Sequence, residues 1–219
     1  MNRSGASYVT ELVITANTDL NPTRYSLLSR LQGWEDQDSW RDFFDTYWRL
    51  IYTVAIKSGL TDPEAQDVVQ ETVVCVAKDI AKFKRDRDRG SFRGWLRNLT
   101  RWRINDQLRK RARFRTVENV DLLTESHPMA QIPDPASPEL EAIWDEEWKA
   151  NLLEVATKRV RRRVREEHYQ IFDLYVMRRW KTRDVAEALG VSVGQVYLAK
   201  HRVASEVKSE VRELQKKWC

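Results

Sequence analysis

The chain has 219 residues, 42% of them hydrophobic, and a formal net charge of +5, which is enough material for two small domains. No stretch approaches the roughly 18 uncharged apolar residues that would span a bilayer, and Glu11 interrupts the start where a signal peptide needs an apolar run. The two cysteines, Cys75 and Cys219, support neither a disulfide framework nor a metal cluster. We therefore expect a soluble cytoplasmic protein without cofactors, metal ions or a membrane partner.

The charge is segregated along the chain. Residues 82–115 carry 14 Lys or Arg against 3 Asp, and residues 151–219 carry 16 basic against 9 acidic residues. The segment between them, 116–150, has 9 acidic residues and 1 basic residue. Two basic blocks separated by an acidic one predict two surfaces for a polyanion. Nucleic acid is the favoured polyanion, and an anionic membrane surface is the rival because Trp95 and Trp102 accompany the first block.

The apolar spacing predicts an all-α protein with two small helical domains joined by a flexible linker, since β-type alternation is almost absent. The first predicted helix covers about 36–58, where apolar residues recur at three- and four-residue steps and Gly59 follows as a stop. A second helix is expected to begin with Thr61 or Asp62 as N-cap and to run to about Phe83.

A basic segment, KRDRDRGS at 84–91, precedes a third predicted helix that Ser91 can cap. Its inward face is expected to hold Phe92, Trp95, Leu96, Leu99 and Trp102. Cations beside aromatic rings suit single-stranded DNA, because Arg holds the backbone while an unpaired base stacks. With both tryptophans inward, stacking falls to the loop and the polar face. A solvated charged face is the plainer alternative. The predicted DNA-binding residues are Lys84, Arg85, Arg87, Arg89, Ser91, Arg93, Arg97, Asn98, Arg101, Asn105 and Arg109.

An acidic patch opens the second predicted helix and consists of Asp62, Glu64, Asp67, Gln70 and Glu71. The spacing of its last three members places them on one helix face. Carboxylates alone do not make an active site, and the three histidines are too scattered to complete a metal or catalytic triad. We therefore expect no enzyme. The residues themselves leave the patch open as a protein-docking surface or an ordinary solvated face.

A proline-rich stretch at 127–138 is typical of a flexible linker, and it holds four of the six prolines. Helices are predicted to resume at Pro138, with further ones at about 166–178, 182–189 and 192–215. The sequence suggests a domain of 24–114, a linker of 115–137 and a second domain of 138–219, after an N-terminal extension of residues 1–23.

The segment TRDVAEALGVSVGQVYLAKHRV (182–203) has the pattern of a helix-turn-helix. Thr182 and Ser192 can cap its two helices, and Gly190 can end the first in a left-handed conformation. The inner stripe of the second helix is expected to hold Val193, Val196, Val203 and Val207. Gln195, Leu198 and Arg202 would face the major groove, and Thr182, Arg183 and Lys200 would contact phosphates. The full predicted DNA-binding set also includes Ser192, Gly194, Tyr197 and His201. A helical hairpin in an ordinary bundle is the alternative.

The order of these features resembles the sigma-70 family, and specifically its short extracytoplasmic-function members, which keep only regions two and four. Residues 61–113 are similar to region two through a D-x-x-Q-E core at Asp67, Gln70 and Glu71, a basic turn, F-x-x-W-L-x-x-L and an Asn-Asp pair at Asn105. The helix-turn-helix is similar to region four, including an S-x-G-x-V start at Ser192.

The resemblance implies that the acidic helix binds core RNA polymerase through basic residues of its clamp helices. The basic loop and helix would melt and capture the −10 element as a single strand, and the helix-turn-helix would bind the −35 element as duplex promoter DNA. An anti-sigma factor is a partner that the resemblance allows. Many relatives have a basic residue where Ala199 stands, so their base contacts do not transfer. The competing functions are a stand-alone helix-turn-helix regulator and, further behind, a nucleic-acid-processing enzyme.

Overall fold

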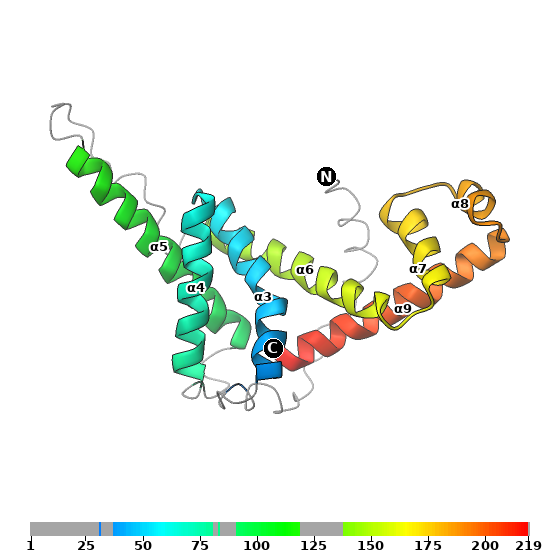
Figure 1. Cartoon of the computed structure of the whole chain (residues 1–219), viewed down its shortest axis with the longest axis horizontal. Coiled ribbons are helices and arrows are strands. Elements are labelled where there is room, and N and C mark those ends of the chain that lie inside the picture. The colour runs from blue at the N-terminus through cyan, green and yellow to red at the C-terminus, as the bar shows by residue number, and fades with distance from the viewer. Residues whose placement is uncertain (1–30, 32–36, 81–82, 84–90, 119–137, 219) are drawn as a thin grey trace. The chain divides into compact units, whose positions relative to one another are not determined.

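The computed structural model describes residues 31, 37–80, 83, 91–118 and 138–218, without the side chains of 114–118 and 217–218. Within these ranges all regular elements are helical and no strand occurs (Figure 1), so the predicted all-α class is confirmed. The chain divides into two compact units, whose described parts fall within Tyr25–Trp148, the first unit, and Lys149–Lys217, the second unit. The predicted N-terminal extension and most of the predicted linker lie outside the described residues.

The first unit contains α3 (Gln37–Lys57), α4 (Asp62–Asp79), α5 (Phe92–Glu118) and the start of α6 (Pro138–Arg161). A tight turn joins α3 to α4. Gly59 has a φ of 86°, and the N–H groups of Gly59 and Leu60 donate to the carbonyls of Ile56 and Ala55 at 3.0 and 3.2 Å. This pairing is a Schellman motif, which satisfies the last carbonyls of α3. Gly59 therefore ends α3, as predicted.

A capping box begins α4. The backbone N–H and the Oγ1 of Thr61 both donate to Glu64 Oε2, at 2.8 and 2.9 Å, and Thr61 is the N-cap. Exposed amides of a first turn gain partners in this way. α4 ends at Asp79, a few residues before the predicted end.

Aromatic rings fill the core of the first unit. Tyr47 lies at its centre, with ring centroids 5.3 Å from Phe43, 5.8 Å from Phe92 and 5.5 Å from Trp148. Trp144 and Trp148 of α6 have exposed fractions of only 1% and 3%. Each such ring buries on the order of 150–250 Å², so the start of α6 is firmly part of this core.

The second unit contains the rest of α6, then α7 (Glu166–Phe172), the π turn η3 (Asp173–Met177), α8 (Thr182–Leu189) and α9 (Val193–Trp218). Glu210 of α9 is buried and lies 3.2 Å from Arg159 and 2.7 Å from Arg163, on the part of the chain around the end of α6. Both segments also present a buried apolar stripe, Leu152, Leu153, Ala156 and Val160 on one and Val203, Val207, Val211 and Leu214 on the other.

The packing departs from the predicted domain boundaries at two points. α5 continues to Glu118, past the predicted start of the linker at 115. Residues 138–148, which the proline pattern assigned to the second domain, pack with the first unit, because Trp144 and Trp148 insert into its aromatic core.

Candidate nucleic-acid interface

A cap and an aromatic cluster position the start of α5. Ser91 Oγ accepts a hydrogen bond from the backbone N–H of Gly94 at 3.2 Å, which gives a free amide of the first turn a partner. Phe92 is buried, and the ring of Trp95 lies 5.7 Å from Phe92 and 5.0 Å from Phe83. Ser91 therefore caps α5 as predicted, and Trp95 packs against the core as expected.

Trp102 lies on the open face of α5, so the prediction of an inward ring is wrong. Its exposed fraction is 56%, and Asn98 and Arg109 share its side of the helix, four residues before it and seven after. The buried stripe follows four-residue steps, which advance by about 40° per turn and carry it away from Trp102, through Leu96, Thr100, Ile104 and Leu108. An exposed indole between polar and cationic neighbours is a platform on which an unpaired base can stack.

The predicted DNA contacts on α5 differ in accessibility. Arg93 and Arg97 form ion pairs with carboxylates of α6. The side chain of Asn105 is buried, with an exposed fraction of 5%, and does not reach the surface of α5. Ser91 and Arg109 are exposed, and Asn98 and Arg101 are half-buried. The four basic residues of the preceding loop lie outside the described residues: Lys84, Arg85, Arg87 and Arg89.

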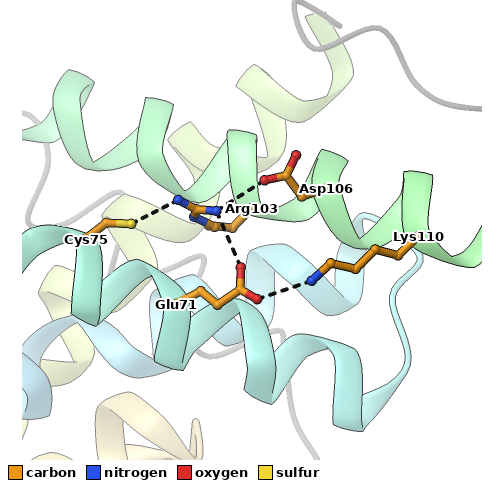
Figure 2. Close-up of polar contacts among 5 residues, drawn as sticks. All are labelled: Glu71, Cys75, Arg103, Asp106 and Lys110. Carbon is orange, nitrogen blue, oxygen red and sulfur yellow. Dashed lines mark hydrogen bonds and ion pairs between the residues drawn. The ribbon is translucent and has the colours of Figure 1, made fainter.

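The acidic patch of α4 divides into paired and open side chains. Glu71 lies 3.6 Å from Arg103 Nη1 and 3.4 Å from Lys110 Nζ, both on α5 (Figure 2). Glu64 lies 3.2 Å from Arg111 of the same helix, and Asp62 accepts a hydrogen bond from the hydroxyl of Tyr52. Asp67 and Gln70 are exposed, and Asp67 forms no ion pair with any residue that the structure describes.

Arg103 is the residue that ties α5 to the acidic helix. Its guanidinium donates to Cys75 Sγ at 3.1 Å and lies 3.2 Å from Asp106 (Figure 2). The hydrogen bond to Cys75 raises the pKa of Arg103, burial opposes this, and the carboxylates of Glu71 and Asp106 add to the rise. The guanidinium is a permanent cation. It holds Glu71 against α5, so Asp67 and Gln70 are the members of the D-x-x-Q-E core that stay open to solvent, and Val74 is exposed beside them.

The second unit contains the predicted helix-turn-helix, formed by α8 and α9. Gly190 ends α8 with φ 63°, and the N–H groups of Gly190 and Val191 donate to the carbonyls of Glu187 and Ala186 at 3.3 and 2.9 Å. This is a second Schellman motif. The cap of α8 differs from the prediction, because Lys181 is the N-cap and Thr182 is the first helical residue.

A reciprocal cap opens α9. The Ser192 N–H donates to Gln195 Oε1 at 2.7 Å, and the Gln195 N–H donates to Ser192 Oγ at 3.2 Å. The carbonyl oxygen of the Gln195 side chain therefore accepts the capping hydrogen bond. The NH₂ group is the part of the side chain that can still donate to a ligand. Sequence spacing did not separate this capping role from the predicted reading role.

An apolar cluster fixes α8 against α9, and it consists of Ile171, Val185, Val196 and Ala199. The predicted inner stripe is confirmed at Val196, Val203 and Val207, which are fully buried. It is wrong at Val193, which is 41% exposed because it is the first residue of α9 and lies beyond the edge of the cluster.

The opposite side of α9 is open to solvent. Leu198 is 72% exposed and has Gln195, His201 and Arg202 around it, all exposed. Tyr197 packs edge-on against Tyr175 at 6.1 Å. An open aliphatic side chain between hydrogen-bond donors matches a base edge with a thymine methyl group. The remaining predicted contacts are Arg183, Ser192 and Gly194, which are exposed, and Thr182 and Lys200, which are half-buried.

α7 lines a groove beside the predicted base-reading residues, which the sequence did not predict. His168 and Gln170 line a groove of about 590 Å³ together with Leu198 and Arg202. No sequence signal places α7 beside α9, because that contact depends on how the helices cross.

No helix in the described ranges is long and apolar enough to cross a membrane, and no three His, Cys, Asp or Glu side chains gather there as a metal site.

Comparison with known proteins adds a family likeness for the first unit. Residues 28–114 match the family model described as Sigma-70 region 2, a range that holds α3, α4 and most of α5. The sigma-70 likeness predicted from the sequence is thus confirmed for this part of the chain. No curated protein matches the chain.

Among solved structures, the chain is similar to one described as the structure of CnrH in complex with the cytosolic domain of CnrY. The sequence identity is 18%, the TM-score is 0.32, and the match covers 84% of this chain and 93% of that one.

Proposed function

We propose that the chain is a sigma factor of the extracytoplasmic-function group, which binds core RNA polymerase and directs promoter recognition, melting and initiation. One observation carries the proposal. The Sigma-70 region 2 match at 28–114 falls on the unit in which an acidic helix and a basic helix pack together, and a helix-turn-helix follows in the second unit. A regulator that binds DNA through a helix-turn-helix alone does not need that first unit.

The proposed polymerase-docking surface is the open part of the acidic patch. Asp67, Gln70 and Val74 are exposed along one side of α4, and a carboxylate without an internal partner is free to pair with a basic surface. Glu71 and Glu64 contribute less directly, because α5 already neutralises them. Loss of either would disturb the fold as well as docking.

The proposed surface for the melted −10 strand is the open face of α5. Trp102 supplies a ring for an unpaired base, and Asn98 and Arg109 flank it on the same side. Alanine substitution of a stacking residue typically removes about 1–3 kcal/mol per base. The groove-facing side of α9 is the proposed reader of duplex −35 DNA, with Leu198 and Arg202 at its centre. An anti-sigma factor as a further partner, and a cytoplasmic location beside polymerase, remain predictions of the resemblance.

The polymerase proposal is tested by gel filtration of the full chain with core RNA polymerase. The unaltered chain should co-elute with core, and Asp67→Lys should not. The matched control is Glu206→Lys, an equal charge reversal at an exposed position of α9. If the unaltered chain binds duplex DNA but never co-elutes with core, the stand-alone regulator is the better description.

The −10 proposal is tested by binding to a dye-labelled single-stranded oligonucleotide. Trp102→Ala should weaken binding by a factor of about 5 to 150, the equivalent of 1–3 kcal/mol. Trp180→Ala, at an indole that is 42% exposed in the second unit, is the control and should leave the affinity within about twofold. Equal losses in the two variants would refute the role of Trp102.

A further inference from the structure

The start of α6, residues 138–148, is strongly acidic and lies on the first unit. It contains five Asp or Glu and no Lys or Arg. Residues 92–113 of α5 contain eight Lys or Arg and a single acidic residue, Asp106. The two segments are therefore complementary in charge, and the acidic one lies outside the range matched by the family model.

The acidic side chains engage the arginines that were predicted to hold DNA. Asp145 lies 2.6 Å from Arg93 Nη2, and Glu141 pairs with Arg97. The Arg93 guanidinium also lies over the ring of Trp148, 5.5 Å from its centroid. Both arginine side chains are about 30% exposed, at 31% and 29%.

Apolar contacts, rather than the ion pairs, seat this segment. Trp144 and Trp148 are almost completely buried, and the Trp148 ring stacks on Tyr47 at 5.5 Å. Asp145 and Glu141 themselves are 50% and 59% exposed. Half-exposed pairs contribute little to stability, so the carboxylates can exchange for another anion without dismantling the aromatic core.

We infer that residues 138–148 are an intramolecular competitor of single-stranded DNA for Arg93 and Arg97 of α5. In the free protein Asp145 and Glu141 each pair with one guanidinium nitrogen, Nη2 of Arg93 and Nη1 of Arg97, and a phosphate oxygen would compete for the same donors. Single-stranded DNA and the acidic segment consequently exclude one another at these two arginines. The open face around Trp102 stays available in both states. The inference rests on the proposed single-stranded DNA binding of α5.

The test removes the two competing charges and keeps the tryptophans. In the full chain, Glu141→Gln with Asp145→Asn should raise the affinity for a dye-labelled single-stranded oligonucleotide by about threefold to tenfold, as expected for two pairs of this kind. The control is Glu146→Gln with Glu147→Gln. It makes the same change in net charge within the same segment, but its carboxylates pair with Lys57 of α3 and not with α5.

Four outcomes are distinguishable. A gain in the first double variant and little or none in the control supports the competition. Equal gains in both reflect net charge alone and overturn it. If the unaltered chain binds the oligonucleotide and the first variant binds no tighter, the competition is wrong while the proposed function stands. If neither the unaltered chain nor any variant binds at low salt, the proposed function fails and the competition fails with it.

Discussion

Neutralising Glu71 or Asp67, two carboxylates one turn apart on α4, should have different effects on stability, because only Glu71 forms ion pairs with α5. Glu71 faces Arg103 and Lys110 at 3.6 and 3.4 Å, and the three side chains are 33–53% exposed. Each pair of this kind contributes about 0.2–1 kcal/mol. We therefore expect Glu71→Gln to cost about 1 kcal/mol. Arg103 keeps Cys75 and Asp106 as partners, so no buried charge is left unpaired.

Asp67 gives the matched comparison. It lies one turn away on the same helix, is exposed and has no ion-pair partner among the described residues. Asp67→Asn should change the free energy of unfolding by less than about 0.5 kcal/mol. In both variants the carboxylate becomes an amide of nearly the same shape, so the two substitutions make the same chemical change at two sites.

Thermal unfolding followed by tryptophan fluorescence measures both variants. For a domain of this size, about 1 kcal/mol corresponds to a drop in Tm of roughly 4–8 °C, expected for Glu71→Gln alone. The difference should shrink at 1 M salt, where the Debye length is about 3 Å. Equal Tm values for the two variants at low salt would refute the division of the patch into paired and open carboxylates.

Three further predictions concern the helix-turn-helix and the hydrogen bond between α3 and the start of α4. Leu198→Ala should reduce the preference for thymine over deoxyuracil in selected duplexes, because removing one methyl contact costs about 0.8 kcal/mol; a preserved preference in binding assays would exclude this contact. Gly190→Ala should destabilise the second unit by about 1–2 kcal/mol in urea unfolding, since φ is 63° there, whereas Gly194→Ala, with only an ordinary contact to Ser192, should be neutral or stabilising. The hydrogen bond to Asp62 raises the pKa of Tyr52 above its ordinary value of 10.0, so its contribution is complete below pH 10 and is lost as pH rises through the raised pKa; the stability of Tyr52→Phe relative to the unaltered chain should recover above pH 10, and parallel pH profiles would contradict this.

Local signals were sufficient for the existence of the helices and for several of their ends. Gly59 and Gly190 terminate helices because each supplies a left-handed residue. Ser91 and Ser192 cap helices because a hydroxyl accepts from a free amide, and Thr61 caps α4 through its hydrogen bonds to Glu64. These effects act over three or four residues, so a single sequence contains them.

The features that the sequence predicted wrongly or did not predict depend on tertiary packing. Trp102 has the spacing of an inward residue relative to Leu99, but a stripe with four-residue steps rotates away from it. The start of α6 follows the linker and reads as part of the second domain, yet its two tryptophans find the core of the first unit. Neither result is encoded in one helix, because both depend on the surface that the helix meets. For the same reason, the pairing of Glu71 with α5 and the cap made by Gln195 became visible only in the structure.

Transcription with purified components is the most direct test of the central claim. The chain should be added to core RNA polymerase with a library of genomic fragments, and run-off products should be sequenced from their 5′ ends. The sigma-factor proposal predicts discrete start sites that share two conserved elements upstream, and it predicts their loss with Asp67→Lys. Products that are the same with and without the chain, or that persist with Asp67→Lys, would contradict it.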